Sequence, residues 1–570
     1  MARAWIGQVD MQRRQQAVWS FVERAVRSYA AATGEVLGGG LVVSPVTLAF
    51  TFELDTLAVE LAESLGRAAA QLPIEEACYQ LSTCYTAMLP QETRSSWGAY
   101  YTPPALTDRL LAMAEDAGVD WQTALVLDPA CGGGAFLLPV ALRMRKALVD
   151  LPAERFLAHI STNLRGFEID PFAAWLTQVW LEIAFADEVR IARQPFPSMV
   201  TVCDSLSQRP AHQKFDLVVG NPPYGRIRLP AHQREHYSRS LYGHANLYGL
   251  FTDLALRWAK PEGVVAYVTP TSFLAGEYFK ALRGLLAMEA SPLAIDFVTE
   301  RRGVFEDVLQ ETVLSTYRLG AHTSAVQVHY LAVNGKAEVT KAGQFELPED
   351  PRDPWLAPRT PDDVPLVAAM AGIPTRLRDW GYKVSTGPLV WNRFKPQFRM
   401  RPGRDTLPVV WAESITADGR FVWRAEKRSH QPYFRPTASD EWLKVDTPCV
   451  LLQRTTAKEQ ARRLIAAEMP EAFIHSHGGV IVENHLNMVK PINGCPKVQP
   501  AAVAAVLNSK IVDRAFRCMS GSVAVSAFEL EALPLPNLAQ MRQIETLLGQ
   551  KAPAGEIEAL LETFYTKDPA

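Results

Sequence analysis

The sequence predicts an α/β protein with a doubly wound parallel sheet at its centre and smaller domains on both sides. Its 570 residues are several times the roughly 150 residues typical of one domain. From about Trp121 to Val298, short apolar runs alternate with amphipathic stretches, which is the pattern of strands and helices in a parallel sheet. Three consecutive glycines follow the first of these strands, at the strand end where such sheets bind ligands.

The chain divides into five expected segments. Residues 1–97 read as mostly helical and carry no recognisable chemical motif. The central α/β domain is expected over 98–335, followed by a proline-rich connector over 336–375, a mixed second domain over 376–540 and a helical tail over 541–570. We expect a helix at Leu247–Ala259. The expected strands of the central domain are Ala124–Leu127, Leu164–Ile169, Met199–Cys203, Phe215–Val219, Val264–Val268, Pro292–Val298 and Thr312–Arg318.

The composition excludes several classes of protein. Hydrophobic residues make up 48% and charged residues 21% of the chain, a balance that excludes general disorder and collagen-like repeats. No apolar run approaches the ~20 residues that span a bilayer, and residues 1–14 lack the apolar centre of an export signal. We therefore expect a cytoplasmic protein. Seven cysteines without any Cys-x-x-Cys pair argue against disulfides and structural zinc.

The charge is unevenly distributed. The net charge of the chain is −3, yet ten basic and four acidic side chains lie between Lys383 and Arg428. Aromatic residues interleave with them: Trp391, Phe394, Phe398, Trp411, Phe421 and Trp423. Such a segment is either a solvated face or a surface that neutralises phosphates and packs against sugars or bases.

The glycine run and an acidic residue beyond it predict a nucleoside site. Gly132–Gly134 follow Asp128 at a strand end, where backbone can approach a ligand closely. The run is neither a dinucleotide fingerprint nor a phosphate loop, since no Lys follows it. Glu168 ends the next strand, and a carboxylate there can accept hydrogen bonds from both hydroxyls of a ribose. Glu168 alone could equally be a surface residue that opens a helix, but together with the loop it indicates an adenosine-bearing ligand.

The most specific motif is Asn221-Pro222-Pro223-Tyr224 at the end of an apolar strand. Two prolines hold the backbone rigidly. A proline carbonyl and the Asn221 side-chain oxygen could together accept both hydrogens of an exocyclic amine, while the Tyr224 ring stacks on the attached base. That arrangement turns the nitrogen lone pair toward an electrophile.

Together these segments resemble the gamma-class N6-adenine DNA methyltransferases, in which a cofactor loop, a catalytic Asn-Pro-Pro-Tyr and a target-recognition domain follow in this order. The resemblance covers about residues 98–319 and begins with Gly98–Pro104. It implies the class I methyltransferase fold, a Rossmann-like doubly wound sheet of seven strands. A helical N-terminal extension and a mixed α+β target-recognition domain at the C-terminus would flank this sheet. It also implies a prokaryotic, nucleoid-associated enzyme of a restriction–modification or phage-defence system.

The resemblance assigns roles residue by residue. The catalytic group would be Asn221, Pro222, Pro223, Tyr224 and Phe305, the last stacking on the target base. S-adenosylmethionine would be bound by Tyr101, Thr102, Asp128, Ala130, Gly132, Glu168, Ile169, Asp204, Ser205 and Phe251. Among these, Glu168 would accept from the ribose, Asp204 from the adenine amine, and Phe251 would pack on the adenine. DNA contacts are expected from Arg393, Lys395, Arg399 and Arg401.

One position departs from the resembled pattern. Gly133 stands where many members of that family have Ser, and we expect the smaller residue only to loosen the loop. In the second domain, residues 384–387, 484–486 and 507–512 look like scattered signatures of target-recognition domains. They do not reveal the DNA sequence that is recognised.

The chemistry that the resemblance implies starts with a target adenine rotated out of duplex DNA, at a cost of a few kcal/mol. Asn221 and the Pro222 carbonyl would bond to N6, and the methyl group would pass in line from the cofactor. Positioning and polarisation are then needed, rather than a strong base or a metal. Asn at the first motif position favours adenine N6 over cytosine N4, because enzymes of the latter kind usually carry Ser.

Other interpretations share some of these residues. Protein-glutamine and some RNA methyltransferases present a planar amide or amine to the same motif, and a non-catalytic DNA-recognition subunit is a further alternative. A fused nuclease is not expected, because residues 1–97 hold no acidic residue followed by Glu-x-Lys. The sequence leaves open whether a separately encoded restriction endonuclease or other defence proteins act with this chain.

Overall fold

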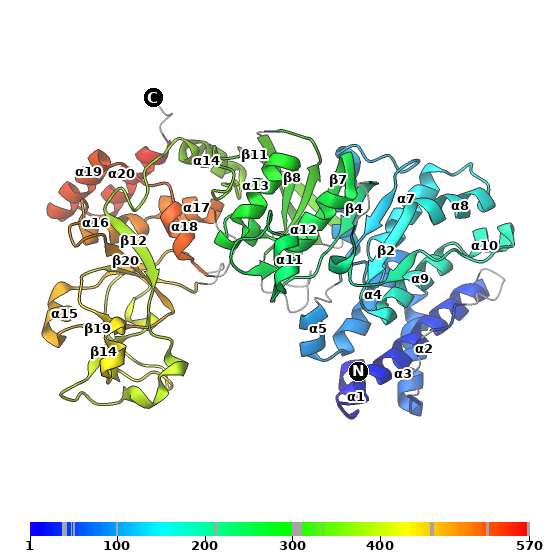
Figure 1. Cartoon of the computed structure of the whole chain (residues 1–570), viewed down its shortest axis with the longest axis horizontal. Coiled ribbons are helices and arrows are strands. Elements are labelled where there is room, and N and C mark those ends of the chain that lie inside the picture. Colours follow the sequence, from blue (N-terminus) through cyan, green and yellow to red (C-terminus); the bar gives the residue numbers. More distant parts are fainter. Residues whose placement is uncertain are drawn as a thin grey trace. The chain divides into compact units, whose positions relative to one another are not determined.

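The computed structural model describes residues 1–36, 43–46, 48, 52–97, 101–209, 214–298, 311–323, 325–334, 336–456, 461–519 and 524–566. The chain forms two compact units (Figure 1). The first unit contains Met1–Pro270 and Gly284–Lys341, and the second contains Thr271–Arg283 and Ala342–Ala570. Among the described residues, no helix has both the length and the apolar character needed to cross a membrane.

A nine-stranded sheet forms the centre of the first unit, in the order β11-β10-β8-β9-β7-β4-β1-β2-β3. The strands are β1 (Val126–Asp128), β2 (Leu164–Glu168), β3 (Val200–Val202), β4 (Phe215–Gly220), β7 (Ala259–Pro270), β8 (Pro292–Val298), β9 (Thr312–Arg318), β10 (Ala325–Asn334) and β11 (Lys336–Glu346). Strand β9 is antiparallel to both of its neighbours, and the other pairings of β1 to β10 that we describe are parallel. The doubly wound sheet and its seven predicted strands are confirmed.

The sheet has two strands more than the seven predicted. Strands β10 and β11 extend it beyond β8, and β10 runs parallel to β8. Both strands mix polar with apolar residues, so they lack the continuous apolar runs by which buried strands are recognised. Strand β11 and the helix α14 (Val364–Ala371) also give regular structure to parts of the range 336–375, for which the sequence suggested a connector.

The order of the strands creates a crevice between β1 and β4. Helices α7 (Leu137–Ala147) and α9 (Pro171–Ala184) link β1 to β2 and β2 to β3, whereas α12 (Leu247–Trp258) links β4 to β7 in the opposite direction along the sheet. Because such crossovers are right-handed, α7 and α9 cover one face of the sheet and α12 covers the other. The carboxyl ends of β1 and β4 therefore face the switch point at which doubly wound folds bind ligands.

The N-terminal helices share one hydrophobic core with the sheet domain. Those that contribute to it are α1 (Ala2–Ile6), α2 (Arg14–Val36), α3 (Thr56–Ala69) and α4 (Ile74–Met88), and α5 (Gln91–Trp97) follows in the chain. The Trp19 ring stacks on Phe172 of α9 at 5.9 Å, and Tyr29 meets the buried Trp180 edge-on at 5.1 Å. Helix α2 is thus packed on α9 by apolar burial.

The second unit is mixed α+β. A four-stranded sheet has the order β12-β20-β17-β18 and a five-stranded sheet the order β13-β15-β14-β19-β16. The strands are β12 (Tyr382–Thr386), β13 (Phe398–Arg399), β14 (Leu407–Val410), β15 (Tyr433–Phe434), β16 (Lys444–Val445), β17 (Val450–Gln453), β18 (Ala466–Glu468), β19 (Val480–Val482) and β20 (Leu486–Pro491). The main helices are α15 (Glu471–His477), α16 (Pro500–Leu507), α17 (Lys510–Met519), α18 (Ala527–Ala532), α19 (Leu538–Gly549) and α20 (Ala554–Thr566).

Two of the signature segments of the second unit meet in space. The Gly387 N–H donates to the Leu486 carbonyl at 2.8 Å, and a Cβ at position 387 would lie 2.2 Å from the Glu483 carbonyl oxygen. These segments lie about a hundred residues apart in the chain. Gly387 is therefore needed for the close approach of two backbones.

Candidate active site

A cavity opens to solvent at the carboxyl ends of β1, β2, β3 and β4; its free space, with the open solvent at its mouth included, is ≈ 1230 Å³. Eleven of the predicted site residues line it: Tyr101, Thr102, Ala130, Gly132, Glu168, Ile169, Asp204, Ser205, Asn221, Pro223 and Phe251. Asp128, Pro222 and Tyr224 do not line it, and Phe305 lies outside the described residues. The side chains of Cys203, Ile227, Gln233 and Leu247, which we had not predicted, also contribute to the wall.

The glycine loop is held by bonds to its backbone. The Gly132 N–H donates to Glu168 Oε2 at 2.8 Å, and the Gly132 carbonyl accepts from the Thr177 hydroxyl of α9 at 2.6 Å. Gly132 has a φ of +53°, and a Cβ there would lie 2.6 Å from the Tyr101 ring. Only glycine suits a position with both restrictions.

The Glu168 carboxylate is shared between the loop and the start of α9. Its second oxygen, Oε1, accepts from the Asp170 N–H at 2.9 Å. Burial raises the pKa of Glu168 to about 7, although both backbone bonds favour the ionised form. The side chain is therefore oriented before a ligand arrives, and it titrates near neutral pH.

Asp128 lies beneath the cavity rather than in its wall. The side chain is fully buried, and its Oδ1 accepts from the Ala130 N–H at 3.0 Å. A Cβ at Gly220 would lie 2.7 Å from this oxygen, so Asp128 fills the space between the ends of β1 and β4. Burial raises the pKa of Asp128 to about 8, so this carboxyl holds a proton at neutral pH.

Asp204 and Ser205 follow β3 at the far end of the cavity. The exposed Asp204 carboxylate accepts from the Leu206 N–H at 3.0 Å and from the Ser207 hydroxyl at 2.6 Å. The buried Ser205 hydroxyl donates to the Pro129 carbonyl at 2.6 Å. Ser205 therefore links this segment to the glycine loop, and its hydroxyl hydrogen is taken up by that bond.

The Asn221 amide is oriented by two neighbours. Its Nδ2 donates to Thr102 Oγ1 at 3.1 Å, and its Oδ1 accepts from the Tyr224 hydroxyl at 2.7 Å. The Tyr224 ring meets Tyr248 edge-on, with centroids 6.1 Å apart. An amide oxygen carries two lone pairs, so the Tyr224 hydroxyl does not by itself exclude a second donor. The sequence did not predict the bond between Thr102 and Asn221.

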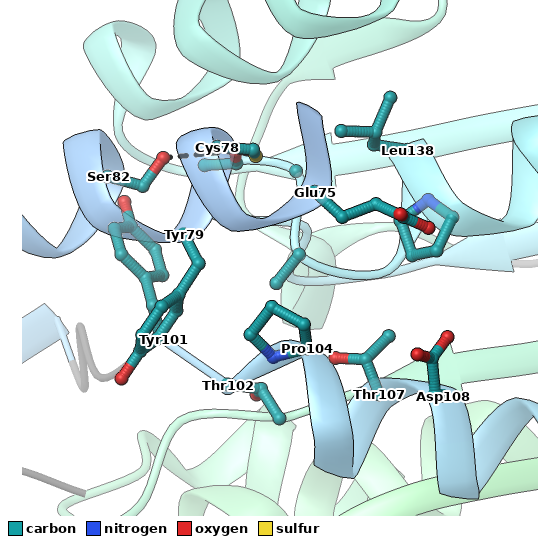
Figure 2. A pocket seen from close by; sticks show the side chains of 14 residues that line it. Glu75, Cys78, Tyr79, Ser82, Tyr101, Thr102, Pro104, Thr107, Asp108 and Leu138 are labelled. Atoms are coloured by element: carbon teal, nitrogen blue, oxygen red, sulfur yellow. Dashed lines mark hydrogen bonds between the residues drawn. The ribbon is translucent and has the colours of Figure 1, made fainter. Parts of the chain in front are cut away.

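Residues of α4, in the segment without a recognisable motif, contact the glycine loop directly. The Gly133 carbonyl accepts from the Ser82 hydroxyl and the Cys78 thiol, both at 3.3 Å. Figure 2 shows these side chains with Tyr101 around a smaller hollow beside the loop. A Cβ at position 133 would lie 2.6 Å from Ser82 Oγ. Our expectation that Gly133 loosens the loop is therefore wrong, because α4 fills the space.

The basic segment of the second unit exposes its cations but buries much of its aromatic surface. Arg393, Lys395, Arg399 and Arg401 are exposed, and none pairs with a carboxylate of the part of the chain that the structure describes. Phe398 and Trp411 are buried in the core around β14, and the four other aromatic residues named above pack partly against that core or the neighbouring one. The prediction that these rings pack against sugars or bases is therefore wrong for Phe398 and Trp411.

Comparison with known proteins gives consistent relatives. Residues 162–305 match the family Eco57I restriction-modification methylase. The type II methyltransferase M.BsuBI of Bacillus subtilis is 24% identical over 456 residues, which are 78% of this chain and 89% of that protein. The type II methyltransferase M.PstI of Providencia stuartii is 27% identical over 347 residues, 58% of this chain and 67% of that protein.

A solved structure supports the fold. The type IIL restriction-modification enzyme MmeI, in complex with DNA, superimposes with a TM-score of 0.53 at 15% identity, covering 91% of this chain and 82% of that one. Its likeness bears on the architecture alone. The strand order and the relatives agree: the chain is similar to restriction–modification DNA methyltransferases and has the class I methyltransferase fold.

Proposed function

We propose that the protein transfers a methyl group from S-adenosylmethionine to N6 of an adenine that is rotated out of duplex DNA. The observation that carries this proposal is the place of the Asn221 amide. It stands in the wall of the cavity that Glu168 and Phe251 also line, and Thr102 and Tyr224 hold it in one orientation. An oriented amide beside a nucleoside-sized cavity suits the presentation of an exocyclic amine.

The cavity suits the proposed cofactor at each of its parts. Glu168 offers carboxylate oxygens to ribose hydroxyls, and the exposed Asp204 can accept from an adenine amine. Ile169 is 56% exposed in this wall and, with the Phe251 ring, gives apolar surface for the adenine faces. When bound, S-adenosylmethionine supplies a sulfonium methyl group as the electrophile.

In this proposal the residues of the chain position and polarise the amine. Asn221 Oδ1 and the Pro222 carbonyl accept its two hydrogens, which draws the nitrogen toward tetrahedral geometry and aims its lone pair. Thr102 keeps the amide nitrogen turned away from the target, so that the oxygen faces it. The Tyr224 ring stacks on the base. Orientation of this kind lowers a barrier without a strong base.

Binding of the duplex is assigned to the second unit. Its exposed cations Arg393, Lys395, Arg399 and Arg401 would contact phosphates, which supplies affinity without sequence information. The choice of site would come from contacts to base edges. Extrusion of the adenine costs a few kcal/mol, which this binding must provide.

Nucleoside mass spectrometry and modification-sensitive sequencing would test the proposal on plasmid DNA from methylation-deficient cells that express either the wild-type protein or Asn221→Ala. We expect N6-methyladenine at one recurring sequence with wild type and none with the variant. Calorimetry should find that Asn221→Ala binds S-adenosylmethionine as wild type does, because its bonds act on the target amine. Methylation by the variant would refute the role of Asn221.

A negative result with wild type would separate the alternatives. If DNA is unmodified but the cofactor binds, the same mass spectrometry on RNA and on protein glutamine would identify another substrate. If the cofactor does not bind, the pocket is inactive and the proposed function fails.

A further inference from the structure

One face of α4 packs against the glycine loop, Gly132–Gly134. Cys78, Ser82 and Tyr85 follow each other at spacings of four and three residues, so they share a face of the helix. All three are buried. Two of them donate to the Gly133 carbonyl, so a helix from the N-terminal segment is bonded directly to this loop.

The third residue of this face reaches the Glu168 segment. The Tyr85 hydroxyl donates to Asp170 Oδ2, while Asp170 Oδ1 caps α9 by accepting from the Phe172 N–H at 2.9 Å. The Asp170 N–H in turn donates to Glu168 Oε1. Tyr85 is therefore one residue removed from the carboxylate in the cavity wall, and its own ring packs on Phe172 at 5.0 Å.

Ser82 and Gly133 are packed so closely that a side chain at position 133 has no room beside Ser82. A Cβ on Gly133 would come 2.6 Å from Ser82 Oγ and 2.9 Å from Ser82 Cβ, distances at which one of the two segments must shift. The next atom, in the Tyr101 ring, is 3.3 Å away. The obstacle is thus mainly a side chain of α4, and Ser82 occupies the volume in which a side chain of residue 133 would stand.

We infer that α4 is a part of the cofactor site and that Ser82 and Tyr85 are positioning residues for it. Ser82 holds the Gly132–Gly134 loop from outside, and Tyr85 holds the segment that orients Glu168. The inference rests on the proposed function for the identity of the ligand. It gives the N-terminal helices a role in cofactor affinity, although none of these side chains lines the larger cavity.

An exchange of the two small residues tests the inference. Gly133→Ser alone should weaken binding of S-adenosylmethionine in calorimetry by about tenfold or more, because the loop and α4 cannot both keep their places. The double variant Gly133→Ser with Ser82→Gly returns a hydroxyl to the same volume and should recover most of the affinity. Gln80→Gly, at an exposed position of α4, controls for the cost of a glycine in this helix.

Tyr85→Phe tests the second contact. We expect the KM for S-adenosylmethionine to rise by about tenfold, since a bond to a buried carboxylate is lost, with kcat at saturating cofactor unchanged. Tyr565→Phe is the matched control. It removes a buried hydroxyl that donates to the Pro534 carbonyl at 2.9 Å in the second unit, so it should cost stability and leave this KM as it is.

The outcomes distinguish this inference from the proposed function. If Gly133→Ser binds as tightly as wild type, or the double variant binds as weakly as the sum of the single variants, α4 does not position the loop. If the wild-type protein fails to bind S-adenosylmethionine, the proposed function fails. Thermal unfolding without ligand of wild type, Gly133→Ser, Ser82→Gly and the double variant then still decides the contact. Non-additive melting temperatures support it, and additive ones overturn it.

Discussion

Two carboxyl groups at the cofactor loop show how strongly position decides the chemistry of a residue. Asp128 and Glu168 are the last residues of two parallel strands and both accept backbone N–H bonds, yet Glu168 borders the cavity and Asp128 lies beneath it. Burial raises the pKa of both, to about 7 and about 8, and the charge of Glu168 contributes to the shift of Asp128. Of the two, only Glu168 lies where it can release its proton and bind a ligand in the cavity.

The titration of Glu168 predicts a pH dependence of cofactor binding. In the proposed function the ribose hydroxyls bind the ionised carboxylate, so below the pKa of about 7 a proton must be released before binding. The Kd for S-adenosylmethionine should therefore rise by about tenfold for each pH unit below that value and level off above it. Calorimetry between about pH 5 and pH 8.5 measures this.

Glu168→Gln is the control for that prediction. It keeps the shape of the side chain and removes its proton, so this variant should bind more weakly and lose the part of the pH dependence that Glu168 causes. Titration of the ligand itself is common to both proteins. Parallel pH curves for wild type and Glu168→Gln would contradict the assignment.

At the scale of the element, the bond between Thr102 and Asn221 joins two segments that are 119 residues apart in the chain. Thr102 precedes α6 (Pro104–Asp116), and Asn221 follows β4. The buried Thr102 hydroxyl accepts from the amide nitrogen and so selects which end of the amide faces the target. In the proposed function, the start of α6 thus contributes to the reacting centre.

Thr102→Val should lower kcat by roughly ten- to thirtyfold, which corresponds to about 1–2 kcal/mol for an amide that has lost its acceptor. Thr102→Ser keeps the oxygen and should stay within about threefold of wild type. Steady-state methylation at saturating cofactor measures both. Since Thr102 also lines the cavity, the cofactor Kd of each variant is measured separately. An unchanged kcat for Thr102→Val would refute the orienting role.

The sequence could predict those elements whose signals are local. Strand β8 was predicted at the bounds that it has, Pro292–Val298, because it is an apolar run interrupted only by Asp296. The ends of β1 and β4 were likewise predictable from local motifs, the glycine run after β1 and Asn-Pro-Pro-Tyr after β4. The polar strands β10 and β11 carry no such run, and the sequence did not predict them.

Contacts between distant segments were not predictable from the sequence. The Tyr85 hydroxyl and Asp170 are 85 residues apart, and a tyrosine on an apolar helix face is indistinguishable from any other core residue until its partner is known. Only the spacing of Cys78, Ser82 and Tyr85 on one face of α4 was available as a signal. Likewise, the aromatic residues of the basic segment gave no sign that Phe398 and Trp411 point into a core.

At the scale of the whole molecule, chemistry and charge are divided between the two units. The first unit contains the cavity and every described residue of the predicted catalytic and cofactor sets. The second contains the basic segment, whose surplus of six positive charges contrasts with the net charge of −3 of the chain. Because phosphate contacts dominate affinity for DNA, binding of the duplex should depend on the second unit far more than the transfer step does.

Removing two cations of the basic segment tests this division. Arg399 and Arg401 are exposed and have no carboxylate partner among the described residues, so each can release a counterion on binding a phosphate. In Arg399→Gln with Arg401→Gln, the slope of log K against log salt should flatten by about 2, with weaker binding to all duplexes alike. Arg378→Gln with Arg542→Gln removes the same charge from exposed positions elsewhere in the second unit and should leave the slope near that of wild type. Fluorescence anisotropy with a labelled duplex over a range of salt concentrations measures both pairs. Equal slopes for the two pairs would place the phosphates on another surface, whereas a flatter slope only for the first pair, with an unchanged cofactor Kd, would assign DNA affinity to the basic segment.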